Sequence, residues 1–441
     1  MSSGVLEPVA APAPPTAPVA PAPAVSRLRF ATAGSVDDGK STLLGRLLYD
    51  TKALFEDQLA AVEAVSAARG HAYPDLALVT DGLRAEREQG ITIDVAYRYF
   101  ATPRRRFIIA DTPGHVQYTR NMVTGASTAD VALILVDARK GLVEQSRRHA
   151  SLCALLRVPH LVLCVNKMDL VGWSAEVFHR IRAEFAAFAG GLGVAEPAAI
   201  PISALLGDNI TARSASMPWY QGPPLLHHLE RVPAAAGPEA AAARFPVQYV
   251  IRPRSARHPD YRGYAGQLVS GVLRPGDEVT VLPSGVTSVI AAIETADGPV
   301  TEARPPMSVT VRLAGEVDVS RGDMICLTRR PATVTRNLTA TVCWMDETRP
   351  LVPGGRYLVK HTTRTARALV DGLSYRLDVN TLARDATAGS LALNEIGEVR
   401  LRTTTPLACD TYQADRSTGG LILIDEASNA TVAAGMITST G

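Results

Sequence analysis

The sequence lacks both a strong imbalance of charge and a long apolar run. Lysine and arginine together number 45 against 43 aspartate and glutamate residues, so the formal net charge is +2. This near-neutral balance gives no support to a general polyanion-binding protein, although a local basic patch is compatible with it. No stretch of about 18 uncharged apolar residues occurs, which argues against a membrane-spanning helix. With 46% hydrophobic and 20% charged residues, the composition is typical of a globular protein.

Cysteine is also scarce, with five residues in a chain of 441 and no CxxC pair. Such a chain does not build a disulfide framework, so we expect reduced thiols in a cytoplasmic protein. The five residues are Cys153, Cys164, Cys326, Cys343 and Cys409.

Proline is plentiful but unevenly placed, because seven of the 30 prolines lie in the first 25 residues. Glu7 is the only charged residue there, and alanines are interleaved with the prolines. A segment of this kind cannot bury enough apolar surface to fold, so we predict a disordered tail at 1–26. A signal peptide is disfavoured because the segment has no basic start and its apolar runs are broken by proline.

Short apolar runs alternate with amphipathic stretches between residues 27 and 232. The runs are continuously apolar, which is typical of parallel strands covered on both faces. We therefore predict an α/β domain at 27–232, with strands at 28–33, 107–110, 131–136 and 161–165 and a helix at 142–156.

The pattern changes after an alanine-rich linker predicted at 233–244. Glycines then separate short β-type runs such as Glu278–Leu282, which is the rhythm of β-hairpins. The remaining length suits two small all-β barrel domains, predicted at 245–333 and 334–441.

The sequence GSVDDGKS at Gly34–Ser41 matches the phosphate-loop pattern GxxxxGK[ST] and stands between a predicted strand and a predicted helix. In such a loop, glycines let backbone N–H groups wrap a phosphate chain. We expect Lys40 to reach the β- and γ-phosphates and the Ser41 hydroxyl to bind Mg²⁺. The predicted phosphate-binding residues are Gly34, Ser35, Val36, Asp37, Asp38, Gly39, Lys40, Ser41 and Thr42, joined by Gly114 from the motif described next.

Two further segments are candidates for binding the γ-phosphate and the metal ion. Asp111 ends a predicted strand and opens DTPG, so it could hold Mg²⁺ through water while the Gly114 N–H approaches the γ-phosphate. Taken alone, DTPG could equally be a turn. Thr92, within GITID, could close over the phosphate and complete the Mg²⁺ shell, but that segment also suits the start of a strand.

A third motif, Asn166-Lys167-Met-Asp169, follows the strand predicted at 161–165. The Asp169 carboxylate can accept hydrogen bonds from both N1–H and the exocyclic amine of guanine, a pair of donors that adenine lacks. A polar loop is the alternative for this motif alone. Ser203, Ala204 and Leu205 stand where a loop supporting the base is required, so the predicted guanine-binding residues are Asn166, Lys167, Asp169, Ser203, Ala204 and Leu205.

The order of these motifs at strand ends resembles GTPases of the translation-factor class, which includes elongation factors Tu and 1-alpha. The resemblance implies an α/β P-loop GTPase domain followed by two all-β barrel domains, as in elongation factor Tu. It also implies GTP and Mg²⁺ as cofactors, and a catalytic role for His115 in positioning the attacking water.

Within that class, the chain is more similar to the GTPase subunit of bacterial sulfate adenylyltransferase. The similarity covers about 28–437. It rests on the loop GSVDDG, on RGYAG with SG and VLPSG in the second domain, and on DVNT, LNEI, LID and NATV in the third. The resemblance implies a GTP hydrolase that drives synthesis of adenylyl sulfate from ATP and sulfate on a separate catalytic subunit. It implies no nucleic acid or membrane partner.

Some members of that family carry a fused adenylyl sulfate kinase after the third domain. No second GxxxxGK[ST] occurs here, so we expect this chain to lack that activity.

Two other functions remain open on the sequence. The same architecture suits a translation factor that carries aminoacyl-tRNA on GTP, and the motifs could also serve a nucleotide-stabilised scaffold without turnover. Away from the motifs, Arg104–Arg106 could face a partner, but we expect them to form a solvated turn between strands. We expect His227 and His228 to be ordinary helix residues.

Overall fold

The computed structural model describes residues 26–54, 60, 62, 66, 76, 94–115, 118–233, 238–253 and 261–441. Nearly all of the predicted tail, and part of the predicted linker, lie outside the described residues. Within the described part of the chain, no helix is long and apolar enough to cross a membrane. All five cysteines are free and buried, as expected for reduced thiols.

The α/β domain is built on a six-stranded sheet with the strand order β2-β3-β1-β4-β5-β6. The strands are β1 (Arg27–Ala33), β2 (Ala96–Ala101), β3 (Arg106–Asp111), β4 (Val131–Asp137), β5 (His160–Asn166) and β6 (Ala198–Pro201). The four predicted strands are confirmed, each within one residue at either end. The neighbours from β3 to β6 pair in parallel, whereas β2 runs antiparallel to β3 and has no predicted counterpart.

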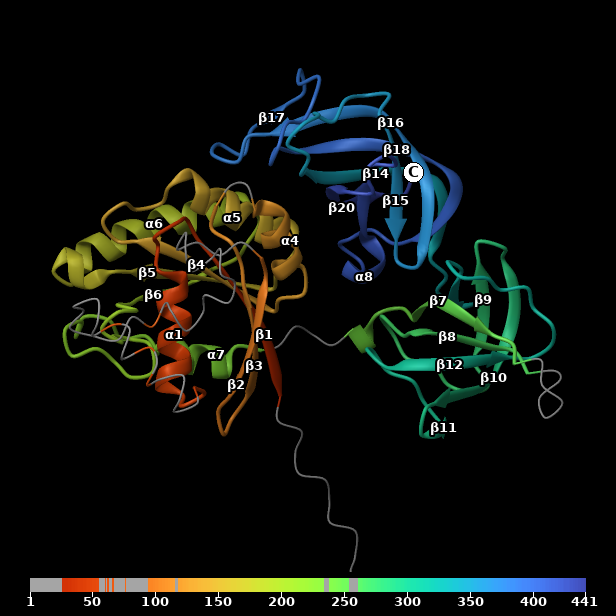
Figure 1. Cartoon of the computed structure of the whole chain (residues 1–441), viewed down its shortest axis with the longest axis horizontal. Helices are drawn as coiled ribbons and strands as arrows, with labels where there is room; N and C mark the ends of the chain where they lie inside the picture. Colours follow the sequence, from red (N-terminus) through yellow and green to blue (C-terminus); the bar gives the residue numbers. More distant parts are fainter. Residues whose placement is uncertain are drawn as a thin grey trace, which may run out of the picture.

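Helices cover both faces of this sheet (Figure 1). They are α1 (Lys40–Asp50), α4 (Thr119–Ser127), α5 (Glu144–Leu155), α6 (Ala175–Gly191) and α7 (Leu225–Arg231). Helices α1 and α7 pack on one face around Leu44 and Leu229, while α4, α5 and α6 pack on the other around Met122, Leu152 and Phe178. Every residue of β4 is buried, because this central strand is covered on both sides. His227 and His228 lie in α7, as predicted.

The turn between β2 and β3 differs from the prediction at two residues: Arg106 is the first residue of β3, and Arg105 is buried. Arg105 is only 4% exposed, and its Nη1 donates to the carbonyl oxygens of Leu229 at 3.0 Å and Val232 at 2.5 Å. The expectation of a wholly solvated turn is therefore wrong at Arg105, because its side chain satisfies the free carbonyl groups at the end of α7.

Two closed barrels follow the α/β domain. Barrel 2 is formed by β7 (Arg244–Ile251), β8 (Gly263–Gln267), β9 (Glu278–Leu282), β10 (Val286–Thr295), β11 (Gly298–Val300), β12 (Ser308–Leu313) and β13 (Met324–Leu327). Pairing of β9 with β10 closes it. The predicted fold class, an α/β domain followed by two β-barrels, is confirmed.

Barrel 3 is formed by β14 (Thr333–Trp344), β15 (Arg356–His361), β16 (Arg364–Leu377), β17 (Arg384–Asp385), β18 (Ile396–Cys409), β19 (Gly420–Ile424) and β20 (Thr431–Ser439). Pairing of β15 with β16 closes it. A short helix, α8 (Arg416–Gly419), lies between β18 and β19.

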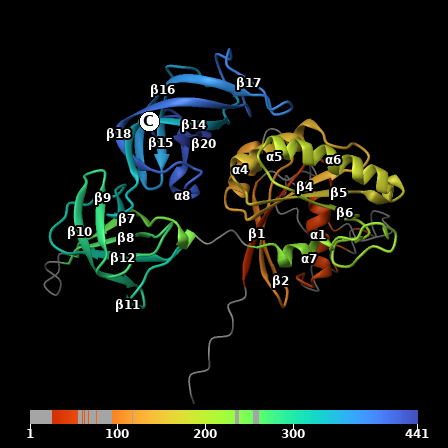
Figure 2. The ribbon, with the colours of Figure 1, turned by 180° about the vertical axis from the view of Figure 1, so that it is seen from behind.

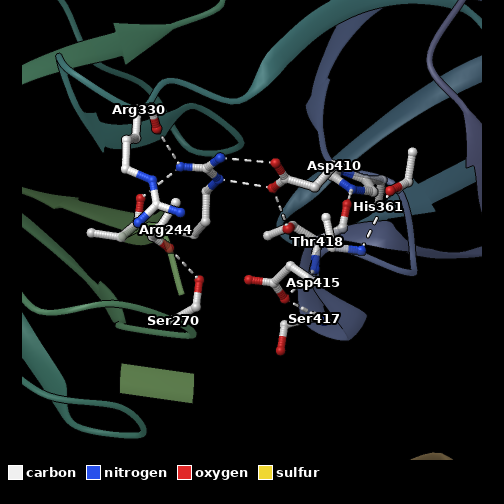
Figure 3. Close-up of polar contacts among 12 residues, drawn as sticks. Arg244, Ser270, Arg330, His361, Asp410, Asp415, Ser417 and Thr418 are labelled. Carbon is white, nitrogen blue, oxygen red and sulfur yellow. Dashed lines mark hydrogen bonds and ion pairs between the residues drawn. The ribbon is translucent and has the colours of Figure 1, made fainter. Parts of the chain in front are cut away.

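A buried ion pair joins the two barrels (Figure 3). Arg244 of β7 is 4% exposed, and its guanidinium binds both carboxylate oxygens of Asp410 at 2.8 Å. The remaining polar atoms are also satisfied: Arg244 Nη1 donates to the Arg330 carbonyl at 2.7 Å, and the Thr418 hydroxyl donates to Asp410 at 2.6 Å. His361 in turn bonds the Thr418 carbonyl at 2.7 Å. Such a fully bonded pair fixes the position of one barrel relative to the other.

Barrel 3 also contacts the α/β domain beside helices α4 and α5, as both views of the molecule show (Figures 1 and 2). The Tyr412 hydroxyl donates to the carbonyl of Leu156, at the end of α5, at 3.1 Å. Arg416 of α8 donates to the carbonyl of Ser127, the last residue of α4, at 2.6 Å. The apolar core on this face of the sheet continues into barrel 3 through Cys343, Met345, Val379, Ile396, Tyr412 and Met436.

Replacing Arg244 by alanine should loosen the junction between the barrels. It leaves the Asp410 carboxylate partly buried without its cation, which costs about 3 kcal/mol or more. We expect amide hydrogen exchange in β7 to speed up accordingly, while exchange in β4 is unchanged. The control is Arg402→Ala, because Arg402 pairs with Asp371 on the surface with 58% of its side chain exposed. Equal exchange in the Arg244→Ala and Arg402→Ala variants would contradict a stabilising role for the buried pair.

Candidate nucleotide-binding site

Three segments predicted to carry chemistry, and a fourth that was not predicted, meet at one edge of the sheet. The strands β1, β3, β4 and β5 are parallel neighbours, so their carboxyl ends lie side by side. The phosphate loop follows β1, Asp111 ends β3, Asp137 ends β4 and Asn166 ends β5. In the sheet, Thr32 stands opposite Asp111, and Asp137 stands opposite Asn166. This is the edge at which open α/β sheets bind ligands.

The loop at 34–39 holds a backbone shape that depends on glycine at its end. Gly39 has φ of 93°, and a Cβ atom there would overlap the side-chain amide nitrogen (Nδ2) of Asn166. Helix α1 begins directly afterwards at Lys40, with no side-chain cap within the described part of the chain. Its first N–H groups are therefore directed toward the sheet edge, where a phosphate group can accept hydrogen bonds from them.

Lys40 places a buried cation at the centre of this loop. It is 7% exposed, and its Nζ donates to the carbonyl oxygens of Gly34 at 2.9 Å and Ser35 at 2.8 Å. Burial lowers the pKa of Lys40, although the nearby carboxylates of Asp111 and Asp38 act in the opposite direction. A polyanion at this position would relieve the cost of burying the ammonium group.

Gly114 lies directly against the phosphate loop. A Cβ atom at this position would overlap Lys40 Nζ and would lie 2.8 Å from the Gly34 carbonyl oxygen. The phosphate loop and the DTPG motif, far apart in the sequence, are therefore in close backbone contact here. Gly114 lies on the same side of the loop as the Lys40 ammonium group. His115 follows it, half-buried, with its ring 6.0 Å from that of Tyr118.

Oxygen ligands for a divalent ion are present on the same side. Asp111 is 1% exposed and accepts a hydrogen bond from the Thr32 hydroxyl at 3.1 Å. Ser41 is the second residue of α1. The described residues contain no group of three His, Cys, Asp or Glu side chains able to hold a metal, so an ion here would take part of its shell from phosphate and water, as Mg²⁺ commonly does. Thr92, the third predicted metal ligand, lies outside the described residues.

Asn166 connects the phosphate loop with the loop after β6. Its amide nitrogen donates to the Asp38 carbonyl at 2.8 Å, and its side-chain oxygen accepts from the Ala204 N–H at 2.9 Å. The flanking Ser203 is fully buried, whereas Leu205 is 47% exposed. The amide of Asn166 is therefore engaged within the chain, and the loop that contains Ala204 is held at the same edge as the phosphate loop.

Lys167 and Asp169 continue this base-side segment. Lys167 has φ of 63°, and its Nζ donates to the Asp37 carbonyl and pairs with Asp137 at 3.1 Å. Its stem thus passes beside the phosphate loop. Asp169 lies half-buried in the short 3-10 helix Met168–Val171, beyond Lys167.

Asp137 is a residue of this site that the sequence analysis missed. It is fully buried, and it accepts two side-chain hydrogen bonds from Arg139, at 3.0 and 2.7 Å, besides pairing with Lys167. Burial by itself raises the pKa of Asp137, but the hydrogen bonds from Arg139 and Lys167 outweigh it and hold the pKa well below its usual range. The available signal was the position of a carboxylate directly after the fully apolar run at 131–136.

Gln145 and His149 of α5 were also missed. They lie beneath the phosphate loop and contact Gly34 and Gly114. Nothing in the sequence marks them, because the closeness of α5 to these loops arises only in the folded sheet.

Comparison with known families agrees with this geometry. Residues 26–270 match the elongation factor Tu GTP binding domain, and residues 337–438 match the GTP-eEF1A C-terminal domain-like family. Among solved structures, Sup35 complexed with GDP aligns at 23% identity over 94% of each chain with a TM-score of 0.43.

Curated relatives are much more similar. The bifunctional enzyme CysN/CysC of Mycobacterium tuberculosis (strain ATCC 25618 / H37Rv) is 64% identical over 410 residues, which cover 93% of this chain and 67% of that protein. Sulfate adenylyltransferase subunit 1 of Aeromonas hydrophila is 52% identical over 414 residues, which cover 93% of this chain and 86% of the relative. The chain therefore belongs to the sulfate adenylyltransferase subunit 1 family, and its nucleotide-binding domain is of the elongation factor Tu type.

Proposed function

We propose that this chain is the GTPase subunit of a sulfate adenylyltransferase, which couples GTP hydrolysis to the synthesis of adenylyl sulfate from ATP and sulfate. The observation that carries the proposal is the convergence of the phosphate loop, Asp111, Gly114 and Asn166 at one sheet edge, in a member of the sulfate adenylyltransferase subunit 1 family. Adenylyl sulfate contains a phosphate–sulfate anhydride, so its formation from ATP is unfavourable and benefits from a coupled hydrolysis.

The nucleotide is GTP. We assign its phosphates to the loop at 34–42 and to Gly114, and its base to Asn166, Lys167, Asp169 and the loop at 203–205. Asp169 supplies the discrimination, because a carboxylate accepts both hydrogen bonds that guanine offers and adenine does not. In this assignment Asn166 acts mainly through the two backbone groups that it holds.

Mg²⁺ fits the oxygen groups on the γ-phosphate side, with Ser41 as a direct ligand and Asp111 acting through water. Thr92 is the third ligand that we propose. When bound, the ion neutralises charge on the β- and γ-phosphate oxygens. The buried position of Asp111, fixed by the Thr32 hydroxyl, keeps its carboxylate at this place before any ion arrives.

Hydrolysis consists of attack by water on the γ-phosphorus, cleavage of its bond to the β,γ-bridging oxygen, and release of GDP and phosphate. The protein contributes position and charge to this reaction rather than covalent chemistry. His115 orients the water from its place next to Gly114. Lys40 and the N–H groups at the start of α1 stabilise the negative charge on the phosphate oxygens.

A separate catalytic subunit binds ATP and sulfate in this proposal. The name "subunit 1" of the relatives supports a partner, and the motifs of this chain provide for one nucleotide. A translation factor carrying aminoacyl-tRNA is less well supported, because relatives with 49% to 52% identity are named sulfate adenylyltransferase subunit 1. GTP-dependent binding of aminoacyl-tRNA would restore that alternative.

The proposed function is tested by mixing the chain with its catalytic partner subunit, ATP and sulfate, and measuring adenylyl sulfate with and without GTP. We expect GTP to raise the amount formed. In the Asp169→Asn variant, the same gain should require xanthosine triphosphate, and the affinity for GTP should fall about 100-fold. The amide oxygen can accept only one of guanine's two hydrogen bonds, without a charge, and the amide NH2 opposes the exocyclic amine of guanine.

The matched control is Asp297→Asn, which changes an exposed aspartate in the turn between β10 and β11. Its response to GTP should equal that of the unchanged protein. No gain with GTP in the unchanged complex would reject the coupling function, and unaltered GTP preference in Asp169→Asn would reject Asp169 as the guanine reader.

His115→Ala should slow GTP hydrolysis about 100-fold, because the water loses the group that orients it. Binding of a non-hydrolysable GTP analogue should change by less than about threefold, since His115 does not hold the phosphates in this proposal. Single-turnover hydrolysis and equilibrium binding measure the two quantities separately. His179→Ala, on the exposed side of α6, is the control. An equal loss of binding and hydrolysis would show that His115 is structural.

A further inference from the structure

Strand β4 lies between β1 and β5 in the sheet, and its last residue, Asp137, is a buried carboxylate bonded by two cations. Its Oδ1 accepts hydrogen bonds from the Arg139 N–H at 2.9 Å and from Arg139 Nε at 3.0 Å. Its Oδ2 accepts from Arg139 Nη2 at 2.7 Å and lies 3.1 Å from Lys167 Nζ. Arg139 alone therefore supplies a balancing charge and three hydrogen bonds. The second cation, Lys167, is more than the burial of one carboxylate requires.

The ammonium group of Lys167 joins Asp137 to the phosphate loop. Besides pairing with Asp137, Lys167 Nζ donates to the carbonyl oxygen of Asp37. The Lys167 side chain is 24% exposed, so without these two acceptors its long stem would be free to take other rotamers. The phosphate loop follows β1 and the guanine motif follows β5. The strand between them thus carries the group that holds the side chain spanning both.

The backbone at both ends of this span has an unfavourable conformation. Lys167 has φ of 63° and Asp37 has φ of 67°, in the left-handed region that residues other than glycine seldom adopt. Such residues keep this conformation where surrounding contacts hold them, and they are concentrated at ligand-binding sites. The hydrogen bond from Lys167 to Asp37 joins two of these residues directly.

Asp137 holds the donor of that bond with a full charge. Burial raises the pKa of Asp137, but the hydrogen bonds from Arg139 and Lys167 outweigh burial and keep the pKa well below its usual range. The carboxylate is therefore ionised at neutral pH, and hydrogen bonds between charged partners are the strongest of their kind.

We propose that Asp137 is a positioning residue of the nucleotide site, which holds the Lys167 ammonium group at the Asp37 carbonyl before the nucleotide binds and thereby raises the affinity for guanine nucleotides. If Lys167 were in place in only a fraction of the molecules, the apparent affinity would fall by that fraction. This role rests on the proposed function, which assigns Lys167 to the guanine base. It adds a residue that lies outside all of the predicted sequence motifs.

Two other roles for Asp137 predict different results. If Asp137 serves only the stability of the sheet edge, its replacement lowers the unfolding temperature but leaves the nucleotide affinity of the folded chain unchanged. If Asp137 acts on the site through Arg139 alone, its replacement still lowers the affinity after the Lys167 ammonium group has been removed. The positioning role requires a loss of affinity that disappears together with that ammonium group.

Three variants separate these roles. Asp137→Asn keeps the size of the side chain, but in either orientation its NH2 group faces donors of Arg139 or Lys167. Lys167→Met keeps the apolar stem and removes the ammonium group, and the third variant combines both changes. The matched control is Asp410→Asn, because Asp410 forms an ion pair of the same two-bond kind with Arg244, between the barrels and not at the nucleotide site (Figure 3).

The measurements are equilibrium binding of GDP and of a non-hydrolysable GTP analogue. We expect Asp137→Asn to lower both affinities about tenfold, as for loss of one hydrogen bond to a charged group, with their ratio unchanged within about twofold. GDP and GTP are affected alike because they share the base. The double variant should bind no more weakly than Lys167→Met, since residues acting through one contact are not additive. Asp410→Asn should keep both affinities.

Hydrolysis gives an independent readout. With GTP at saturation, the single-turnover rate of Asp137→Asn should stay within about twofold of the unchanged chain, because binding and not the chemical step is altered. Unchanged affinities in folded Asp137→Asn, a further loss in the double variant, or an equal loss in Asp410→Asn would each overturn the proposal. If Asp137→Asn does not fold, Asp137→Ser is measured against the same outcomes.

Failure of the proposed function has a different signature. If the unchanged chain does not bind guanine nucleotides, the proposed function and the role of Asp137 are both wrong. If the unchanged chain binds and hydrolyses GTP while Asp137→Asn keeps its affinities, only the role of Asp137 is wrong.

Discussion

The buried ammonium group of Lys40 is the interaction on which the arrangement of the sheet edge depends. A cation that is 7% exposed is costly, and in this structure its Nζ donates to the carbonyls of Gly34 and Ser35. The loop must therefore curl over the side chain, and this shape requires φ of 93° at Gly39. Gly114 can then lie against Lys40 only because it has no Cβ atom. The same ammonium group thus fixes the loop shape and the distance between two motifs, and it leaves a place whose electrostatics favour a polyanion.

The base side of the site depends on the phosphate side through shared backbone groups. Asn166 donates to the Asp38 carbonyl, and Lys167 donates to the Asp37 carbonyl, so both residues are bonded to the phosphate loop. Asp137 stabilises this arrangement, because its buried carboxylate pairs with the Lys167 ammonium group at 3.1 Å and holds it in place. A shift of the phosphate loop would therefore also disturb the segment that carries Asp169.

The sequence was most informative where chemistry coincides with a strand end. The phosphate loop, Asp111 and Asn166 could be placed because each follows a run of apolar residues, and parallel strands bring such positions to one edge. Arg105 could not be predicted as buried, because its partners are carbonyl groups at the end of a helix more than a hundred residues away in the chain. The position of His149 beneath the phosphate loop could not be predicted for a related reason. Its partner is the backbone N–H of Gly34, and every residue except proline has a backbone N–H, so the sequence does not mark this one.

Helix α4, which follows Gly114 in the chain, and helix α5, whose Gln145 contacts Gly114, also contact barrel 3. Helix α4 ends at Ser127, whose carbonyl is held by Arg416, and α5 ends beside Leu156, whose carbonyl is held by Tyr412. Close-packed helices move as units rather than deforming continuously. A movement of helix α4 or α5 would therefore be transmitted to barrel 3 through these direct contacts. The buried pair between Arg244 and Asp410 extends those contacts to barrel 2, so a continuous series of polar contacts joins the α/β domain, barrel 3 and barrel 2.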